Sequence, residues 1–245
     1  MTWTEMVMQA APARGDRPAV TDVRTGEVMT YATLVRRVTH AAAGLRRHGL
    51  RYGDRVLVDL PPGAALPCAV HAVAWSGGVA VLGPTSTAAG LAIVNRRRET
   101  RAEKVFTFEP GQGADRFSSL IGEASVDFGP LAGPALSLDG RHVLTHEDLT
   151  GDLRRLATRL HIVKDDVVLV AVNDPLKALR TMDLVFACGA QVVVAHEPTL
   201  IGCRVLASEH AATLVVAPYE LARRLLGDPL LRVIDDRAVV SSLAL

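Results

Sequence analysis

Residues 134–149 read Pro134-Ala-Leu-Ser-Leu-Asp-Gly-Arg-His-Val-Leu-Thr-His-Glu-Asp-Leu149. This stretch decides the predicted fold because, with a short gap at the turn, it matches residues 18–34, Pro18-Ala-Val-Thr-Asp-Val-Arg-Thr-Gly-Glu-Val-Met-Thr-Tyr-Ala-Thr-Leu34. In both, two short apolar runs flank a turn that contains glycine, and a threonine then precedes a helical pattern. The chain is therefore predicted to contain two related halves, residues 1–132 and 133–245.

The first half continues with strands and helices in alternation. After a hairpin at 19–31, a helix is predicted from Thr30 to His48-Gly49, because apolar residues recur every three or four positions. Strands separated by helices are typical of a parallel sheet. The further predictions are strands at 55–60, 79–82 and 104–108, helices at 65–76 and 88–99, and a glycine-rich linker at 110–133.

The second half repeats this plan after its own hairpin at 135–145. Thr145, followed by Glu147 and Asp148, is interpreted as the start of a helix rather than as a catalytic group. The predicted fold class is α/β, with two pseudo-repeated three-layer αβα halves built on mostly parallel sheets. Helices are predicted at 146–160, 176–188, 200–210 and 219–226, and strands at 167–172, 191–195, 213–217 and near 238–241.

Composition excludes several classes of function. The 245 residues include 27 basic and 26 acidic side chains, so no overall field attracts nucleic acid, and 4% aromatic residues leave few rings for base stacking. No stretch reaches the ~18 apolar residues of a membrane span, and the N-terminus lacks the pattern of a secretion signal, which predicts a cytoplasmic protein. Cys68, Cys188 and Cys203 are interpreted as buried thiols, and no metal site is predicted.

Several motifs share the order and spacing of a known family. They are Thr30-Tyr31-x-x-Leu34, Gly49-Leu50, Gly53-Asp54-Arg55-Val56 and Gly78 in the first half, and Val143-Leu-Thr-His-Glu-Asp-Leu149 in the second. Together they resemble the N-terminal region of AMP-forming acyl-CoA synthetases and related adenylate-forming ligases. The resemblance covers most of residues 17–240, and it implies the two-part α/β large domain of that family.

The sequence departs from the family where the family binds nucleotide. In the family, a Ser/Thr/Gly-rich loop ending in Pro-Lys-Gly precedes the Leu-Thr-His step and holds the phosphates of ATP. Here that place holds only Leu136-Ser-Leu-Asp-Gly-Arg-His142, so a plain hairpin is predicted and no cofactor is expected. Residue 245 also precedes the family's adenine, ribose and catalytic-lysine motifs, so no catalytic residue is assigned.

One candidate substrate-binding site follows from topology. Ligands of open α/β sheets bind beyond the carboxyl ends of the parallel strands. Those ends select Asn173, Asp174 and Lys177 after one predicted strand and His196 after the next. A solvated loop rim is the alternative interpretation of the same residues.

The function predicted from these observations is that of a catalytically inactive relative of acyl- or aryl-acid–CoA ligases. It is expected to act as an accessory protein that binds a partner, such as an acid-activating ligase or a carrier protein. Three alternatives stay open: a split or residual ligase completed by a second chain, a module that binds an acyl or aryl acid, and a truncated gene product without function.

The C-terminal segment predicts association. A terminal strand there would have an uncovered apolar face or edge, and such surfaces are usually interfaces. A homodimer or an obligate partner is therefore expected. The residues predicted at the contact are Leu226, Leu230 and Leu231 together with the exposed Val239, Val240, Leu243 and Leu245.

Overall fold

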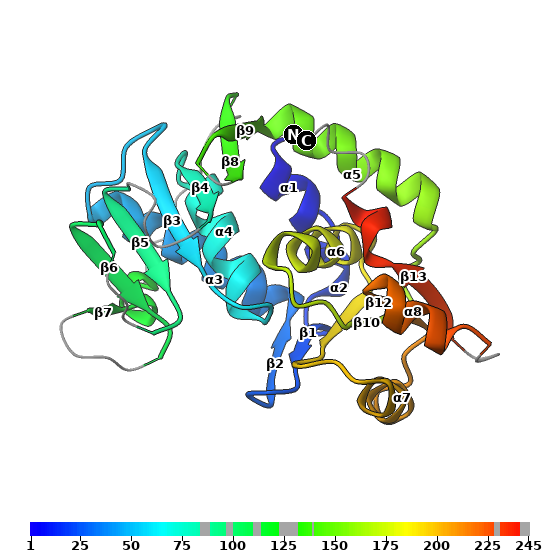
Figure 1. Cartoon of the computed structure of the whole chain (residues 1–245). Helices are drawn as coiled ribbons and strands as arrows, with labels where there is room; N and C mark the ends of the chain where they lie inside the picture. The colour runs from blue at the N-terminus through cyan, green and yellow to red at the C-terminus, as the bar shows by residue number, and fades with distance from the viewer. Residues whose placement is uncertain are drawn as a thin grey trace. The chain divides into compact units, whose positions relative to one another are not determined.

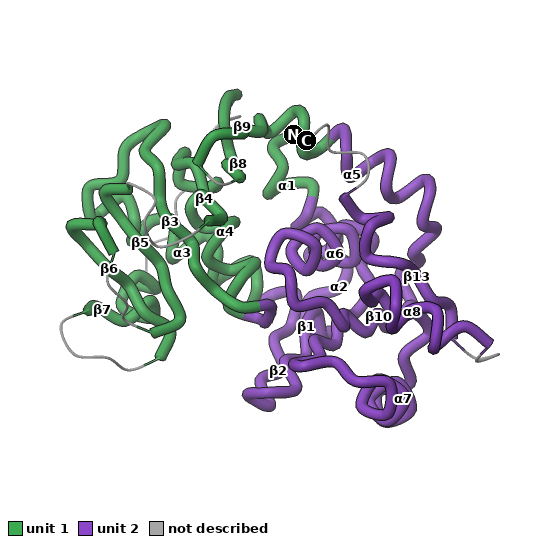
Figure 2. Tube along the Cα trace, viewed as in Figure 1, with its two compact units in different colours: residues 1–6, 34–61, 65–150 green, residues 7–33, 62–64, 151–245 purple. Residues whose placement is uncertain are grey.

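The computed structural model describes residues 1–83, 89–96, 100–109, 114–122, 132–138, 140–227 and 231–240. The chain forms two compact units (Figure 2). Unit 1 comprises residues 1–6, 34–61 and 65–150, and unit 2 comprises residues 7–33, 62–64 and 151–245. Each unit is built on one mostly parallel sheet. The predicted α/β fold class is therefore confirmed.

Unit 2 contains a six-stranded sheet, which we call sheet A (Figure 1). Its neighbouring strands are parallel except for β2, which is antiparallel to β1. The central strands are continuous apolar runs, as expected for a sheet with helices on both faces. In spatial order the strands are β13 (Arg232–Asp235), β12 (Leu214–Ala217), β10 (Val167–Val170), β11 (Gln191–Val194), β1 (Pro18–Asp22) and β2 (Glu27–Thr30).

Helices cover both faces of sheet A. Helix α6 (Pro175–Cys188) connects β10 to β11, whereas α7 (Leu200–Glu209) and α8 (Tyr219–Leu225) lead to the strands on the other side of β10. Right-handed crossovers place α6 on one face and α7 and α8 on the other, as Figure 1 shows for α6 and α7. Leu169 and Val215 of the sheet belong to one buried cluster with residues of α7 and α8. Sheet A therefore lies between two helical layers.

Unit 1 contains a seven-stranded sheet, which we call sheet B. In spatial order its strands are β7 (Asp115–Arg116), β6 (Lys104–Thr107), β5 (Leu91–Val94), β3 (Arg55–Asp59), β4 (Val79–Leu82), β8 (Pro134–Leu138) and β9 (His142–Thr145). The helices of the first 122 residues are α1 (Trp3–Met8), α2 (Ala11–Arg14), α3 (Tyr31–Arg47), α4 (Ala65–Trp75) and the 3₁₀ helix η1 (Phe117–Leu120). Helix α5 (His146–Leu160) follows β9, and the 3₁₀ helix η2 (Asp236–Val239) follows β13.

Each hairpin pairs with strands from the other half of the chain. β1 pairs in parallel with β11, and β8 pairs in parallel with β4. Both hairpins have a register irregularity at the same place, after Pro18 and after Pro134. The two compact units therefore do not coincide with residues 1–132 and 133–245. The reason is that long-range strand pairing places each hairpin in the sheet of the other half. The hairpin–helix–strand order occurs twice, and a repeat of common origin stays a prediction.

The helix predicted at 88–99 is wrong, because Leu91–Val94 form β5 between β3 and β6. All four residues of β5 are buried. A short apolar run fits a buried strand as well as part of a helix, and in this chain pairing with two parallel neighbours decides for the strand.

The C-terminal elements also differ from the prediction. Where a strand was expected near 238–241, residues 236–239 form η2, and the last described strand is β13 at 232–235. Val239 is fully buried, so its predicted exposure is wrong. Leu226 is exposed, whereas Leu231 and Val240 are partly buried. Residues 241–245, with Leu243 and Leu245, lie outside the described residues, as does Leu230.

Candidate functional site

The carboxyl edge of sheet A contains the predicted site residues, and the strand order defines a switch point there. From β10 the chain crosses to β11 on one side, and it later returns to β12 on the other side. Val170 of β10 lies opposite Val216 of β12, so the two strands end at the same level. Ligands of open α/β sheets bind where the connections diverge in this way. Asn173 and Asp174 follow β10, and Tyr219 follows β12.

Asp174 has a structural role in this edge. Its backbone is extended, and its carboxylate accepts a hydrogen bond of 2.9 Å from the backbone N–H of Lys177, so Asp174 is the N-cap of α6. Pro175 is favourable next to it because the first helical residue needs no N–H donor. The neighbouring Asn173 is exposed, and within the described residues its side chain makes no hydrogen bond. Its amide is the polar group left at this edge for a ligand.

Lys177 is engaged by an acidic partner. Its Nζ lies 3.1 Å from the Asp236 carboxylate, which is buried at the start of η2. Next to this pair, Asp235 accepts hydrogen bonds from Arg237, and these hydrogen bonds lower the pKa of the Asp235 carboxyl. The Arg237 guanidinium in turn lies 4.2 Å from the centre of the Tyr219 ring. The edge thus combines neutralised charge pairs with one aromatic ring.

His196 forms its hydrogen bond with Asp22 rather than with a residue that follows β10. It follows β11, and its Nε2 lies 3.1 Å from a carboxylate oxygen of Asp22 at the end of β1. The buried Asp22 also accepts hydrogen bonds from the backbone N–H groups of Arg24 and Ala64, at 3.1 and 3.2 Å. These contacts connect the hairpin, the segment 62–64 and the end of β11. One local signal indicates the role of Asp22, because an aspartate directly before a turn commonly accepts backbone hydrogen bonds within that turn.

A buried cluster of charged side chains, which the sequence did not predict, lies along α6. Arg180 is fully buried and forms ion pairs with Asp152 of α5 and with Asp183, whose carboxylate lies 3.8 Å from the guanidinium. The Arg180 Nε and Nη1 atoms have no hydrogen-bond partner within the described part of the chain. Charged residues on a helix usually face solvent, so nothing in the local pattern indicated this burial.

The connection between β8 and β9 is short. The two strands pair up to Leu138 opposite His142, so three residues of sequence separate them. The backbone N–H of Arg141 donates to the Leu138 carbonyl at 3.1 Å, and the Gly140 carbonyl accepts from Arg55 at 2.9 Å. These backbone groups of Gly140 and Arg141 therefore have partners within the chain.

Within the described ranges, no three His, Cys, Asp or Glu residues come together as metal ligands. No helix in the described part of the chain is both long enough and apolar enough to cross a membrane.

Comparison with known families decides the relationship of the first half. Residues 7–127 match the sequence model of a family described as AMP-binding enzyme. This segment belongs to the AMP-binding enzyme family. The recognition of motifs between Thr30 and Gly78 as those of adenylate-forming ligases is therefore confirmed.

Two plant proteins match part of the chain. The 4-coumarate–CoA ligase-like 3 of Oryza sativa subsp. japonica is 42% identical over 77 residues, which is 31% of this chain and 13% of that protein. The 4-coumarate–CoA ligase 4 of Arabidopsis thaliana is 35% identical over 80 residues, covering 31% of this chain and 14% of that protein. The chain thus matches a small fraction of each AMP-binding relative.

Solved structures of adenylate-forming ligases share the fold over almost the whole chain. The Mycobacterium smegmatis MbtA apo structure has a TM-score of 0.81 at 23% identity, over 99% of this chain and 55% of that one. A benzoate CoA ligase from Burkholderia xenovorans has a TM-score of 0.76 at 21% identity, over 94% of this chain and 52% of that one. The chain described here therefore spans about half the length of these structures.

Proposed function

We propose that this chain is a catalytically inactive relative of AMP-forming acid–CoA ligases that works as an accessory, partner-binding protein. The observation that carries the proposal is the short connection between β8 and β9. In the resembled family the corresponding connection is a loop rich in Ser, Thr and Gly that ends in Pro-Lys-Gly. Here the pairing of β8 with β9 continues to Leu138 and His142, and the first backbone N–H after the turn glycine is already used.

Electrostatics around this turn supports the same proposal. Acyl adenylation relies on positioning and charge stabilisation of a triphosphate, and family members provide a lysine at the loop for this purpose. The only basic residue of the turn is Arg141, and a single exposed guanidinium cannot replace a cradle of N–H donors. A chain without that cradle is expected to bind Mg-ATP poorly at this position.

A role in binding a partner is supported by apolar side chains on the surface of unit 2. Ile201 and Val205 are one turn apart on α7 and are 76% and 47% exposed, and Leu226 after α8 is 65% exposed. Large exposed apolar side chains that lie near one another commonly mark interaction sites. A homodimer, or a complex with an acid-activating ligase or a carrier protein, would cover them.

Thermal unfolding in the presence of Mg-ATP tests the proposal. A ligand at a hundred times its dissociation constant stabilises the folded state by about 2.7 kcal/mol. We expect millimolar Mg-ATP to leave the melting temperature of this chain unchanged, whereas a catalytically active acid–CoA ligase measured alongside should be stabilised. A reproducible rise of several degrees for this chain would overturn the proposal.

The same chain also has a feature that favours acid binding as a second candidate function. At the switch point of sheet A, the Asn173 amide and the ring of Tyr219, which is 43% exposed, provide a polar and an aromatic contact. Isothermal titration with a set of acyl and aryl acids tests this candidate. Binding that is lost in Asn173→Ala and Tyr219→Ala variants would support it. ATP–pyrophosphate exchange by this chain mixed with a copurified ligase would instead support a split enzyme.

A further inference from the structure

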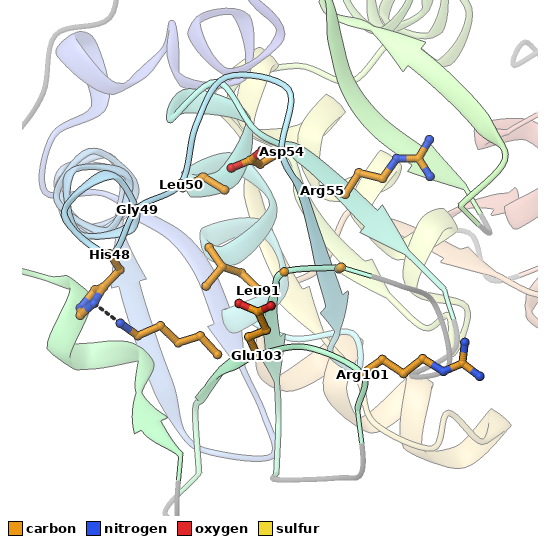
Figure 3. A pocket seen from close by; sticks show the side chains of 11 residues that line it. His48, Gly49, Leu50, Asp54, Arg55, Leu91, Arg101 and Glu103 are labelled. Carbon is orange, nitrogen blue, oxygen red and sulfur yellow. Dashed lines mark hydrogen bonds between the residues drawn. The ribbon is translucent and has the colours of Figure 1, made fainter.

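Unit 1 contains a groove on the edge of sheet B opposite to the carboxyl ends of its strands. Its volume is about 650 Å³, within the size range of small-molecule sites. The walls come from the end of α3 at His48 and from the first residues of β3, β5 and β6, so the groove follows the amino ends of three parallel strands. Figure 3 shows the side chains that line it.

The groove has an apolar floor. Leu50 and Leu91 line it and are only 3% and 8% exposed, because each also packs into the interior of unit 1. Gly49 and Gly90 lie beside them, and a Cβ added to either would meet no atom within 4 Å. Space for an apolar group is therefore open over the two glycines, at the edges of the two leucines.

Lys104 is held at one side of this floor by a histidine. Its Nζ donates a hydrogen bond of 2.6 Å to Nδ1 of His48, as the dashed line in Figure 3 shows. Burial and the positive charge of Lys104 lower the pKa of the His48 imidazole. The lowered pKa favours the neutral imidazole, whose Nδ1 accepts the hydrogen bond from the Lys104 Nζ.

The remaining charges of the groove favour an anion. Arg55 and Arg101 add two guanidinium groups, and Arg101 makes no ion pair within the described residues. Of the two acidic side chains, Asp54 accepts a hydrogen bond of 2.8 Å from the backbone N–H of Arg51, which partly compensates its charge. Glu103 is the other acidic side chain that lines the groove. The lining thus includes three cations and two carboxylates, although the Arg55 guanidinium donates to the Gly140 carbonyl at 2.9 Å and, like Arg101, extends away from Glu103 in Figure 3.

We propose that this groove is a binding site for an amphipathic organic anion, with the apolar body on Leu50 and Leu91 and the anionic group at Lys104. Arg55 and Arg101 would raise the local concentration of the anion. Glu103 would oppose it, so the affinity is limited by a carboxylate of the protein itself. The proposal does not depend on the function proposed above, because it concerns the other edge of a different sheet.

Titration of the full chain with 2-naphthalenesulfonate, followed by amide chemical shifts, tests this site. We expect saturable shifts at Gly49, Gly90 and Leu91. The neutral isostere 2-naphthalenesulfonamide should bind about fivefold more weakly, the factor that about 1 kcal/mol of exposed ion pairing provides. Binding should also weaken in high salt, which screens exposed charges.

Three variants should differ from one another in their affinity for the sulfonate. Lys104→Gln should weaken sulfonate binding about fivefold, and Glu103→Gln should tighten it about twofold or more. Arg36→Gln, which removes an exposed charge on α3 away from the groove, should leave it unchanged. Equal binding by all variants, equal binding of the sulfonamide, or shifts confined to other residues would each overturn the proposal. Melting temperatures near that of the parent chain show that the variants are folded.

Discussion

Gly44 on α3 lies directly against the backbone of Leu120 in η1. A Cβ added to Gly44 would stand 2.7 Å from the Leu120 Cα and even closer to its carbonyl oxygen. Both residues are buried in unit 1, and a backbone atom cannot rotate away as a long side chain can. Glycine at position 44 is therefore required by the close approach of two backbone segments.

Gly44→Ala should destabilise the protein although alanine is the better helix former. Overpacking costs about 1–3 kcal/mol, which exceeds the helix propensity gained. The matched control is Gly151→Ala on α5, where the new Cβ would lie 3.6 Å from the flexible Arg155 side chain. That variant should be equally stable or up to about 1 kcal/mol more stable. Urea unfolding of the two variants measures both effects, and a stabilised Gly44→Ala protein would contradict the close approach.

Acid should destabilise the protein through His146. Its Nδ1 accepts a hydrogen bond from the Trp3 backbone N–H, and burial together with the nearby His71 lowers its pKa from 6.5 to about 4. The folded state therefore keeps His146 neutral while the unfolded state takes up a proton. The stability contributed by the neutral imidazole is complete above pH 6.5 and is lost as the pH falls from 6.5 to about 4, with an upper limit of about 3 kcal/mol.

Unfolding free energies at pH 7 and pH 4.5 test this expectation. A His146→Leu variant removes the titrating group, so its stability should depend less on pH over this range than that of the parent chain. The variant itself should be less stable at pH 7, because the Trp3 N–H loses its acceptor. Identical pH dependence of the two proteins would assign the acid sensitivity to other groups.

Removing the charge of Arg180 should lower the free energy of unfolding substantially. Arg180→Met removes the buried guanidinium that lies next to Asp152 and Asp183, and breaking a buried ion pair on one side typically costs about 3–5 kcal/mol. Arg155→Ala is the control. The Arg155 side chain is exposed, and its guanidinium lies 3.6 Å from the carboxylate of the same Asp152. This substitution should cost less than about 1 kcal/mol. The triple variant Arg180→Met, Asp152→Leu, Asp183→Leu should recover much of the loss in thermal unfolding, and a further loss would contradict a purely electrostatic cost.

Each hairpin pairs with a strand from the other half of the chain, so we expect each half to need the other in order to fold. Residues 1–132 alone lack β8 next to β4, and residues 133–245 alone lack β1 next to β11. Each fragment would expose an unpaired apolar strand edge, so each should aggregate or stay unfolded. When the two are coexpressed, we expect a soluble complex with the circular dichroism of the parent chain. A folded, monomeric 1–132 fragment would show instead that the halves are independent domains.

Local signals determined most helices and both hairpins of this protein. Thr30 accepts from the Thr33 N–H at the start of α3, and Thr145 and Asp148 exchange hydrogen bonds at the start of α5. Partners within three residues of one another form these caps, so the amino-acid order suffices to predict them. The β8–β9 hairpin was predictable for the same reason, because it depends on the few residues between two strands.

Tertiary structure alone decided which strands pair and which side chains meet. Leu91–Val94 is a strand because β3 and β6 flank it. Each hairpin joins the sheet that contains strands from the other half of the chain, because β1 pairs in parallel with β11 and β8 with β4. The contact of His196 with Asp22 joins residues 174 positions apart. Hydrophobic periodicity reports which face of an element is buried but not which element covers it. Strand order, the burial of Arg180 and the groove beside Lys104 therefore required the folded chain.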